Sequence, residues 1–211
     1  MSKTDSSTTH QHRCTKPIPY LIITNISKRQ NVRNLLQLAA AYGCPAIFVV
    51  GQRAFNFNPD AENTDMPAML QSGVRNGKMK IVKFDKLEEC VKHIKSIPCC
   101  DEFGSTDVGK DYGDMSNDSK RPTIPILGVE IDNSSINLED EPFTTSTAFM
   151  MGNEGSGMTA KQMSVCDGFI RISQYGGGTA SLNVSVAAGL ALHRFFHWSR
   201  GDVVKRYCDE R

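Results

Sequence analysis

Two glycine-rich segments carry the polar side chains of this 211-residue chain that are best placed for chemistry. Residues 152–158 read GNEGSGM, a compact loop that holds one carboxamide, Asn153, and one carboxylate, Glu154. Residues 174–183 read QYGGGTASLN, in which three glycines allow main-chain groups to fold tightly against a flat heterocycle. The first segment lacks both the Lys-Ser/Thr of a P-loop and the spacing GxGxxG, which disfavours a nucleotide-phosphate site. Taken alone, each segment also fits an ordinary turn between a strand and a helix.

Other side chains suggest contacts with nucleic acid or metal. Lys28, Arg29 and Arg33 form a compact basic cluster, suited to phosphate contacts or to a solvated surface. Two aromatic rings in the run RAFNFN, residues 53–58, are suited to stacking on bases or to packing in the core. His193 and His197 have the spacing of zinc ligands, but the run between them lacks Glu and no third ligand is evident. We therefore expect no metal.

The elements that must position these residues are short apolar runs, each followed by a loop and, in most cases, by a helical period. Strands are predicted at 19–24, 44–50, 80–84, 124–131, 147–151 and 169–172, and helices at 32–42, at 87–97, shortly after 158, and from 181 onward. Gly43 is the expected glycine after the first helix, and Ser181 the expected N-cap of the last. This order predicts an α/β fold with a mainly parallel sheet and helices on both faces. In such sheets ligands bind beyond the carboxyl ends of strands, which selects the loops after residues 24, 151 and 172.

Composition limits the class of protein. The formal net charge of +1 excludes a broadly basic surface, so any RNA contact must come from local clusters. Seven cysteines without a CxxC pair favour a reducing compartment. The first residues lack an apolar signal core, and no segment has the character of a membrane span. We expect a disordered tail at 1–17, one domain at 18–200 with a flexible insertion at about 99–122, and a tail at 201–211.

Three stretches together resemble the three motifs of the SpoU/TrmH-type RNA 2′-O-ribose methyltransferases of the SPOUT superfamily. They are NISKRQNVRNLLQLAAAYG, FMMGNEGSGM and IRISQYGGGTASLNVSVAAGLAL, and the resemblance extends from about residue 19 to residue 198. It implies S-adenosylmethionine as cofactor, methyl transfer to a ribose 2′-hydroxyl of tRNA or rRNA, and a stand-alone catalytic domain. It also implies a deep trefoil knot in the C-terminal part of the fold and a homodimer with the active site near the subunit interface.

The resemblance assigns roles to single residues where the motifs match. Cofactor positions fall on Gly152, Ile172 and Leu182, and the glycine turn adds Gln174 and Gly176. Polar positions around the transferred methyl group and the ribose fall on Asn31, Glu154, Ser181 and Asn183. Lys28, Arg29 and Arg33 are the expected RNA contacts. Carboxamides and hydroxyls suit the orientation of the reacting oxygen, which methyl transfer requires.

The first motif departs from the family pattern. The family has a glycine where this chain has Arg33, and an arginine where it has Gln37. That arginine is the family's candidate for activating the 2′-hydroxyl, and a neutral amide lacks its fixed charge. Arg33 lies one helical turn before Gln37, so one interpretation makes Arg33 the replacement catalytic cation. The other interpretation is a cofactor- and RNA-binding module with weak or absent activity.

The partners follow from the same reasoning. We expect RNA and a second copy of the chain, and we consider an accessory protein that selects the substrate. A dimeric scaffold without cofactor binding is the non-enzymatic alternative. We expect an intracellular protein of the cytoplasm or nucleus, with an organelle left open.

Overall fold

The computed structural model describes residues 16–98, 123–176 and 181–201. The expected insertion at 99–122 and most of both expected tails lie outside the described residues, as do residues 177–180 of the glycine turn. The strands are β1 Pro19–Thr24, β2 Ala46–Val50, β3 Lys80–Phe84, β4 Ile126–Val129, β5 Ile136–Asn137, β6 Thr147–Met151 and β7 Gly168–Arg171. The helices are α1 Arg29–Ala41, α2 Ala68–Arg75, α3 Leu87–Ser96, α4 Ala160–Met163 and α5 Val184–Ser199, with a 3₁₀ turn η1 at Leu138–Asp140.

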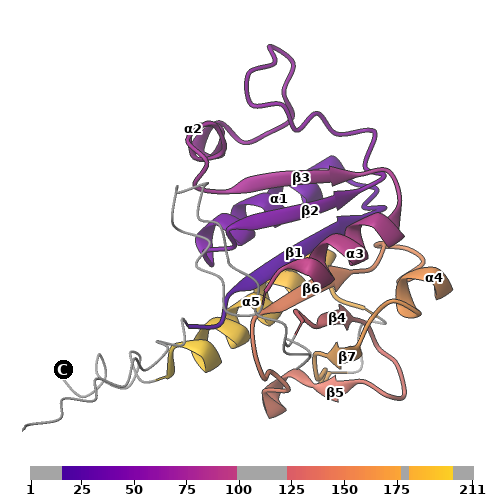
Figure 1. Cartoon of the computed structure of the whole chain (residues 1–211). Helices are drawn as coiled ribbons and strands as arrows, with labels where there is room; N and C mark the ends of the chain where they lie inside the picture. Colours follow the sequence, from indigo (N-terminus) through magenta and orange to yellow (C-terminus); the bar gives the residue numbers. More distant parts are fainter. Residues whose placement is uncertain (1–15, 99–122, 177–180, 202–211) are drawn as a thin grey trace, which may run out of the picture.

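The seven strands form one sheet in the order β3-β2-β1-β6-β4-β7-β5, and each neighbouring pair runs parallel. The arrowheads of β1, β2 and β3 accordingly point to one side of the molecule in Figure 1. The α/β class and the mainly parallel sheet predicted from the sequence are therefore confirmed. The carboxyl ends of all seven strands lie at one edge, where the candidate residues are expected to meet.

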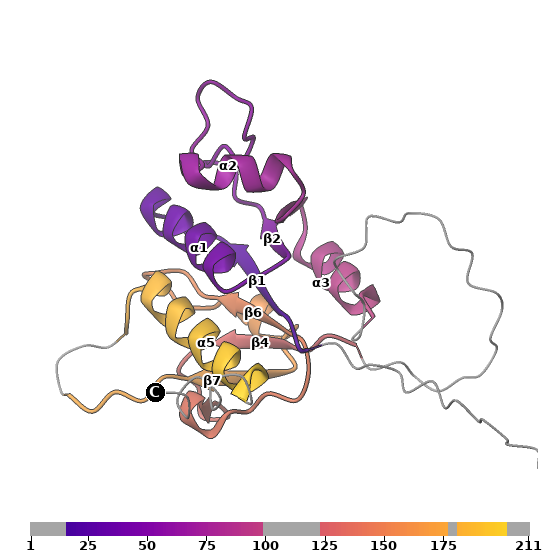
Figure 2. The same ribbon diagram turned by 90° about the vertical axis from the view of Figure 1, so that its left-hand side faces the viewer.

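Helices cover both faces of the sheet. Figure 2 shows α1 and α5 side by side on one face and α3 on the other, and α1 contacts α5 directly. Along β1, Leu21 and Ile23 pack beneath α1 and α5, whereas Tyr20 and Ile22 belong to the core beneath α3. A strand buried on both faces has no polar side to show. This explains why the central strands read as continuous apolar runs.

Several boundaries differ from the sequence prediction. The last helix begins at Val184, and its N-cap is Asn183, whose side chain accepts a hydrogen bond from the Ser185 amide. The prediction of Ser181 as N-cap is therefore wrong. Gly43 does follow the C-cap of α1, with a φ of 71° that suits glycine. The sequence predicts only loop and short helix over residues 52–79, without bounds, and α2 lies in this stretch and has no fully buried residue. The two-residue strand β5 was not predicted, because it is too short for a period to emerge.

Among the helices that the structure describes, none has both the length and the apolar character that a bilayer span requires.

Candidate functional site

The carboxylate of Glu154 binds the segment between β1 and α1. One oxygen, Oε2, accepts from the Ser27 amide at 2.9 Å, and Oε1 accepts from the Lys28 amide at 3.1 Å and from Asn31 Nδ2 at 2.9 Å. Lys28 is the N-cap of α1 but provides no side-chain cap. The carboxylate thus occupies the positive end of the α1 dipole, where an anion is favoured. Two loops that are far apart in the sequence are thereby joined.

These contacts determine the charge state of Glu154. Burial would raise the pKa of its carboxyl group, but the hydrogen bonds from the Ser27 amide, the Asn31 carboxamide and the Lys28 amide outweigh burial, so the pKa lies below its usual value. The group is therefore an anion at neutral pH and a weak base. It is better suited to holding donors in place than to accepting a proton from a substrate.

A chain of hydrogen bonds continues from Glu154 into α5. Because the carboxylate only accepts, Asn31 must turn its Nδ2 toward it, which leaves Asn31 Oδ1 to accept from Asn183 Nδ2 at 3.2 Å. Asn183 Oδ1 in turn accepts from the Ser185 amide at 2.9 Å and from Ser185 Oγ at 2.6 Å. Asn34 Nδ2 completes the chain by donating to Ser185 Oγ at 3.3 Å. Every carboxamide orientation in this chain, which we call the Glu154 network, follows from the anion at its end.

The glycine loop at residues 152–158 is shaped around a second side chain, Asn153. Its Nδ2 donates to the Asn25 carbonyl at 2.7 Å and to Ser27 Oγ at 2.8 Å, and its Oδ1 accepts from the Gly155 amide at 2.9 Å. At Gly152 the loop comes close to its own backbone, because a Cβ there would lie 2.8 Å from the carbonyl carbon of Gly157. Glycine at 152 is therefore required by close approach of the backbone.

A cavity of about 240 Å³ lies beside the network, at the carboxyl ends of β4 and β7. Its apolar lining comes from Val129, Ile131, Ile170, Ile172, Leu182 and Ala187, and its polar lining from Glu130, Arg171, Gln174 and Ser181. Leu182 lines the cavity while the next residue, Asn183, belongs to the Glu154 network. A ligand that contacts Leu182 in the cavity therefore lies beside Asn183, the adjacent residue, which belongs to the Glu154 network.

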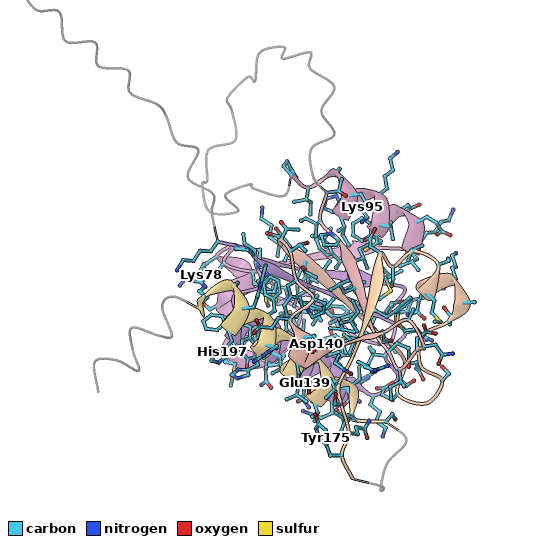
Figure 3. The ribbon with its side chains drawn as sticks, turned by 90° about the horizontal axis from the view of Figure 1, so that it is seen from below. Lys78, Lys95, Glu139, Asp140, Tyr175 and His197 are labelled. Atoms are coloured by element: carbon cyan, nitrogen blue, oxygen red, sulfur yellow. The ribbon has the colours of Figure 1, made fainter. Side chains whose placement is uncertain are left out.

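The structure brings together most, but not all, of the residues selected from the sequence. Ile172, Leu182 and Gln174 share the cavity, whereas Gly152 and Gly176 are not among its lining residues. Ser181 lines the cavity but takes no part in the Glu154 network. Tyr175, next to Gly176, is 92% exposed and projects from the rim of the molecule in Figure 3.

Arg33 lies apart from the Glu154 network in this structure. Its Nε donates to the Asp65 carbonyl at 2.9 Å, and its Nη2 lies 3.7 Å from Asp65 Oδ1. Arg29 also binds Asp65, with Nη1 3.2 Å from Oδ1, so two members of the basic cluster share one carboxylate. Gln37, one helical turn after Arg33 on α1, contacts α2, with its Nε2 3.9 Å from Met69 Sδ.

The two histidines with the spacing of zinc ligands contact each other and a tyrosine. The rings of His193 and His197 lie 4.4 Å apart, and His193 Nδ1 is 3.4 Å from the Tyr42 hydroxyl. Within the described ranges, no group of three or more His, Cys, Asp or Glu side chains is arranged to hold a metal ion.

Sequence reasoning missed several members of the site, among them Asn34, Ser185 and Glu130. Asn34 and Ser185 extend the Glu154 network, and Glu130 lines the cavity and accepts from the Met158 amide at 2.8 Å. Glu130 directly follows the apolar run of β4, so the rule that polar residues at carboxyl strand ends form sites would have selected it. No comparable signal marks Asn34, which lies within a helix.

Known proteins resemble this chain in sequence and in fold. The model of the SpoU rRNA Methylase family matches residues 19–193. The 23S rRNA (guanosine-2′-O-)-methyltransferase RlmB of Acinetobacter baylyi is 25% identical over 173 residues, which cover 82% of this chain and 57% of that protein. The chain thus spans little more than half the length of this curated relative.

Two solved structures illustrate the likeness in fold. The SpoU methyltransferase AviRb from Streptomyces viridochromogenes, in complex with AdoMet, superposes with a TM-score of 0.59 at 18% identity, covering 87% of this chain and 58% of AviRb. A structure described as giving insights into the 2-OH methylation of C/U34 on tRNA superposes with a TM-score of 0.61 at 14% identity, covering 88% of this chain and 98% of the other.

Proposed function

The chain belongs to the SpoU rRNA Methylase family, and from this premise we propose that it transfers a methyl group from S-adenosylmethionine to a ribose 2′-hydroxyl of RNA. The substrate is a tRNA or an rRNA, in keeping with what the similar proteins are named for. The Glu154 network beside an apolar cavity is the observation that carries this proposal. We place the protein in the cytoplasm or nucleus, where such RNAs are made or used.

The cavity fits the cofactor in chemical character. Apolar walls from Ile172 and Leu182 suit a flat heterocycle, while Gln174, Ser181 and Glu130 offer polar groups that fix orientation. The volume of about 240 Å³ is bounded by described residues alone. Two of these, Gln174 and Ser181, lie on either side of residues 177–180 in the sequence. When bound, S-adenosylmethionine supplies an electrophilic methyl group. Gly152, the first residue of the segment 152–158, and Gly176, the first glycine of the segment 174–183, remain proposed cofactor-binding residues.

The residues of the network have different proposed roles because their exposure differs. Asn183 and Ser181 are exposed and can hydrogen-bond a ribose, whereas Asn31 is only 4% exposed and acts by orienting Asn183. Glu154 holds Asn31 and the Ser27–Lys28 amides in place, so it contributes position rather than a proton acceptor. The result is a ribose site whose donors are fixed before the substrate arrives, which favours in-line attack.

The charge at the site comes, in our proposal, from Arg33. The Arg33 side chain is 42% exposed and shares Asp65 with Arg29, so an incoming RNA phosphate can compete with Asp65 for the guanidinium group. Lys28 and Arg29 contribute phosphate contacts beside it. A positive group near the ribose favours the ionised 2′-oxygen, the role that the family assigns to the position of Gln37.

Binding without transfer is the second candidate function. It is favoured by Gln37, whose neutral amide contacts Met69 and brings no charge to the site. A dimeric scaffold that binds no cofactor is less favoured, because the chain retains the cavity and the Glu154 network.

We also propose a homodimer and a C-terminal trefoil knot. Exposed apolar side chains on α5, Val186 at 50% and Leu190 at 41%, continue past Leu182 to Ile131 and support an interface beside the cavity. Light scattering on Val186→Lys should then give a monomer. The knot is supported by the insertion of β7 between β4 and β5, and tracing residues 177–180 in an experimental structure tests it. Substrate selection would rest on the dimer surface, the 99–122 segment or an accessory protein.

The deciding experiment is paired. Calorimetry measures S-adenosylmethionine binding, and transfer of labelled methyl groups to tRNA and rRNA is then followed by nucleoside analysis for 2′-O-methylation. Binding with transfer supports the enzyme, binding without transfer to either RNA supports the module, and absence of binding supports the scaffold. Arg33→Ala should abolish transfer while cofactor affinity is unchanged, and an unchanged rate would remove Arg33 from the mechanism. Arg75→Ala, which removes an arginine paired with Asp60 elsewhere on the surface, is the matched control.

A further inference from the structure

A second cavity, of about 300 Å³, lies at the carboxyl ends of β2 and β3 and takes no part in the cofactor site. Its floor is aromatic, from Phe55, Phe57 and Phe84. Phe55 and Phe57 pack against each other with ring centroids 4.5 Å apart and are 4% and 3% exposed, whereas Phe84 is partly exposed. The sequence suggested these two rings for base stacking or for packing in the core, and the structure places them in the core, at the base of a cavity.

The rim of this cavity carries two cations and one carboxylate, Arg53, Lys83 and Asp85. Lys83 Nζ lies 5.4 Å from the centroid of the Phe57 ring, which holds the ammonium group over the aromatic floor. Within the part of the chain that the structure describes, neither Arg53 nor Lys83 forms an ion pair. By contrast, the arginines of α1 and α2 are all paired with aspartates. The two free cations leave the rim suited to an anion.

Hydrogen bonds connect this cavity to the chain segment that binds Glu154. Gln52, part of its lining, donates from Nε2 to the Ile26 carbonyl at 2.6 Å and accepts at Oε1 from the Ile26 amide at 3.0 Å. Ile26 immediately precedes Ser27 and Lys28, whose amides hold Glu154. Strands β1 and β2 are neighbours, with Thr24 opposite Val50.

This connection sets the distance between the two sites. Neighbouring strands are about 4.8 Å apart, so the cavity above β2 and β3 lies roughly 5–10 Å from the end of β1 and roughly 15–25 Å from the cavity at β4 and β7 that Ser181 lines. A nucleic acid strand advances about 3.4 Å per nucleotide, so these distances are the span of several nucleotides. One RNA strand can therefore reach both sites.

We propose that this cavity is a subsite for a nucleotide of the substrate RNA that flanks the one held at the Glu154 network. Its phosphate lies at Arg53 and Lys83, and its base lies against Phe84, the partly exposed ring of the floor, where Asp85 accepts from base or ribose donors. The proposal rests on the RNA substrate of the proposed function and adds where a neighbouring nucleotide binds.

The test measures binding of a fluorescein-labelled single-stranded RNA of random sequence at several salt concentrations. The variants are Arg53→Ala, Lys83→Ala and the double variant. Lys78→Ala is the matched control, because Lys78 is exposed, precedes the opposite end of β3, and lies at the periphery in Figure 3. Loss of this one phosphate contact should reduce the salt dependence, the slope of log K against log[salt], by about 0.7 in the double variant and by less in each single variant. The Lys78→Ala slope should equal that of the wild type.

Slopes and affinities that match Lys78→Ala in all three variants would overturn the subsite. Calorimetry with adenosine monophosphate alone distinguishes a site for free nucleotides: tight binding that Arg53→Ala abolishes, with an unchanged RNA slope, would also overturn it. Cofactor binding and methyl transfer are measured separately. A reduced slope in the variants supports the subsite even if the wild type transfers no methyl group, so failure of the reaction and failure of the subsite give different results.

Discussion

Replacement of Glu154 by glutamine removes the negative charge of the Glu154 network and tests how much that charge stabilises the fold. The carboxylate accepts three hydrogen bonds, and a carboxamide can keep at most two, because its NH₂ group must then face an N–H donor. A hydrogen bond to a charged group contributes roughly 1.5–3 kcal/mol, and the loop is partly exposed, so we expect the free energy of unfolding to fall by about 1.5–2 kcal/mol. For a chain of this size the loss corresponds to a decrease of ~3–8 °C in Tm. Calorimetry or denaturant unfolding at neutral pH measures it.

The pH dependence separates a lost anion from a general loss of packing. Because the hydrogen bonds hold the pKa of Glu154 below its usual value of 4.5, its ionised form stabilises the fold above that value, and the stabilisation disappears as pH falls through the folded-state pKa. The difference between wild type and Glu154→Gln should therefore be constant from neutral pH to about 5 and should shrink below it. Glu62→Gln makes the same chemical change at an exposed position and should cost almost nothing. A difference that persists at low pH, or an equal loss in Glu62→Gln, would refute the reasoning.

Three further predictions concern single positions. Gly152→Ala should destabilise the protein and reduce cofactor affinity, because the new Cβ would lie too close to the backbone of Gly157 and Met158. Gly155→Ala should be tolerated, because the nearest atom to its Cβ is 3.6 Å away. Thermal unfolding and calorimetry compare the two variants. Asn183→Ala should lower the free energy of unfolding by about 1 kcal/mol through the lost cap and should also slow transfer, while Ser181→Ala should slow transfer alone, as seen from paired unfolding and rate measurements. Gln37→Arg should raise the rate of methyl transfer with cofactor affinity unchanged, and an unaltered rate would mean that charge at this position does not limit the reaction.

Local signals determined how far the fold could be predicted. The bounds of β1 and β6 agree with the sequence to the residue, because each is a short apolar run that ends just before a polar residue or a glycine. The N-cap of α5 was misplaced, since Ser181 and Asn183 are both good caps and only the hydrogen bond to Ser185 identifies the one in use. Local patterns also could not reveal that Glu154 contacts Asn31, a residue 123 positions away. The strand-end rule placed the loops after residues 24 and 151 at one edge of the sheet, and the family resemblance assigned both residues to one site, but neither identified this contact.

The Glu154 network limits where the reaction can obtain its charge. All three of its carboxamides and its serine are neutral, and its one carboxylate is occupied by three donors, so nothing within it is suited to remove a proton from a ribose. Of the cations beside the network, Lys28 and Arg29 are assigned to phosphate contacts, which leaves Arg33, whose Nη2 lies 3.7 Å from Asp65 Oδ1. The ion pair is long, and the Arg33 side chain is 42% exposed although that of Asp65 is only 13% exposed, so a charge-assisted bond to a phosphate or an oxyanion can replace it. Asp65 would also keep Arg29 and the Asn56 amide as partners. Exchange of Arg33 from Asp65 to the RNA is therefore inexpensive, which makes retained activity compatible with glutamine at position 37.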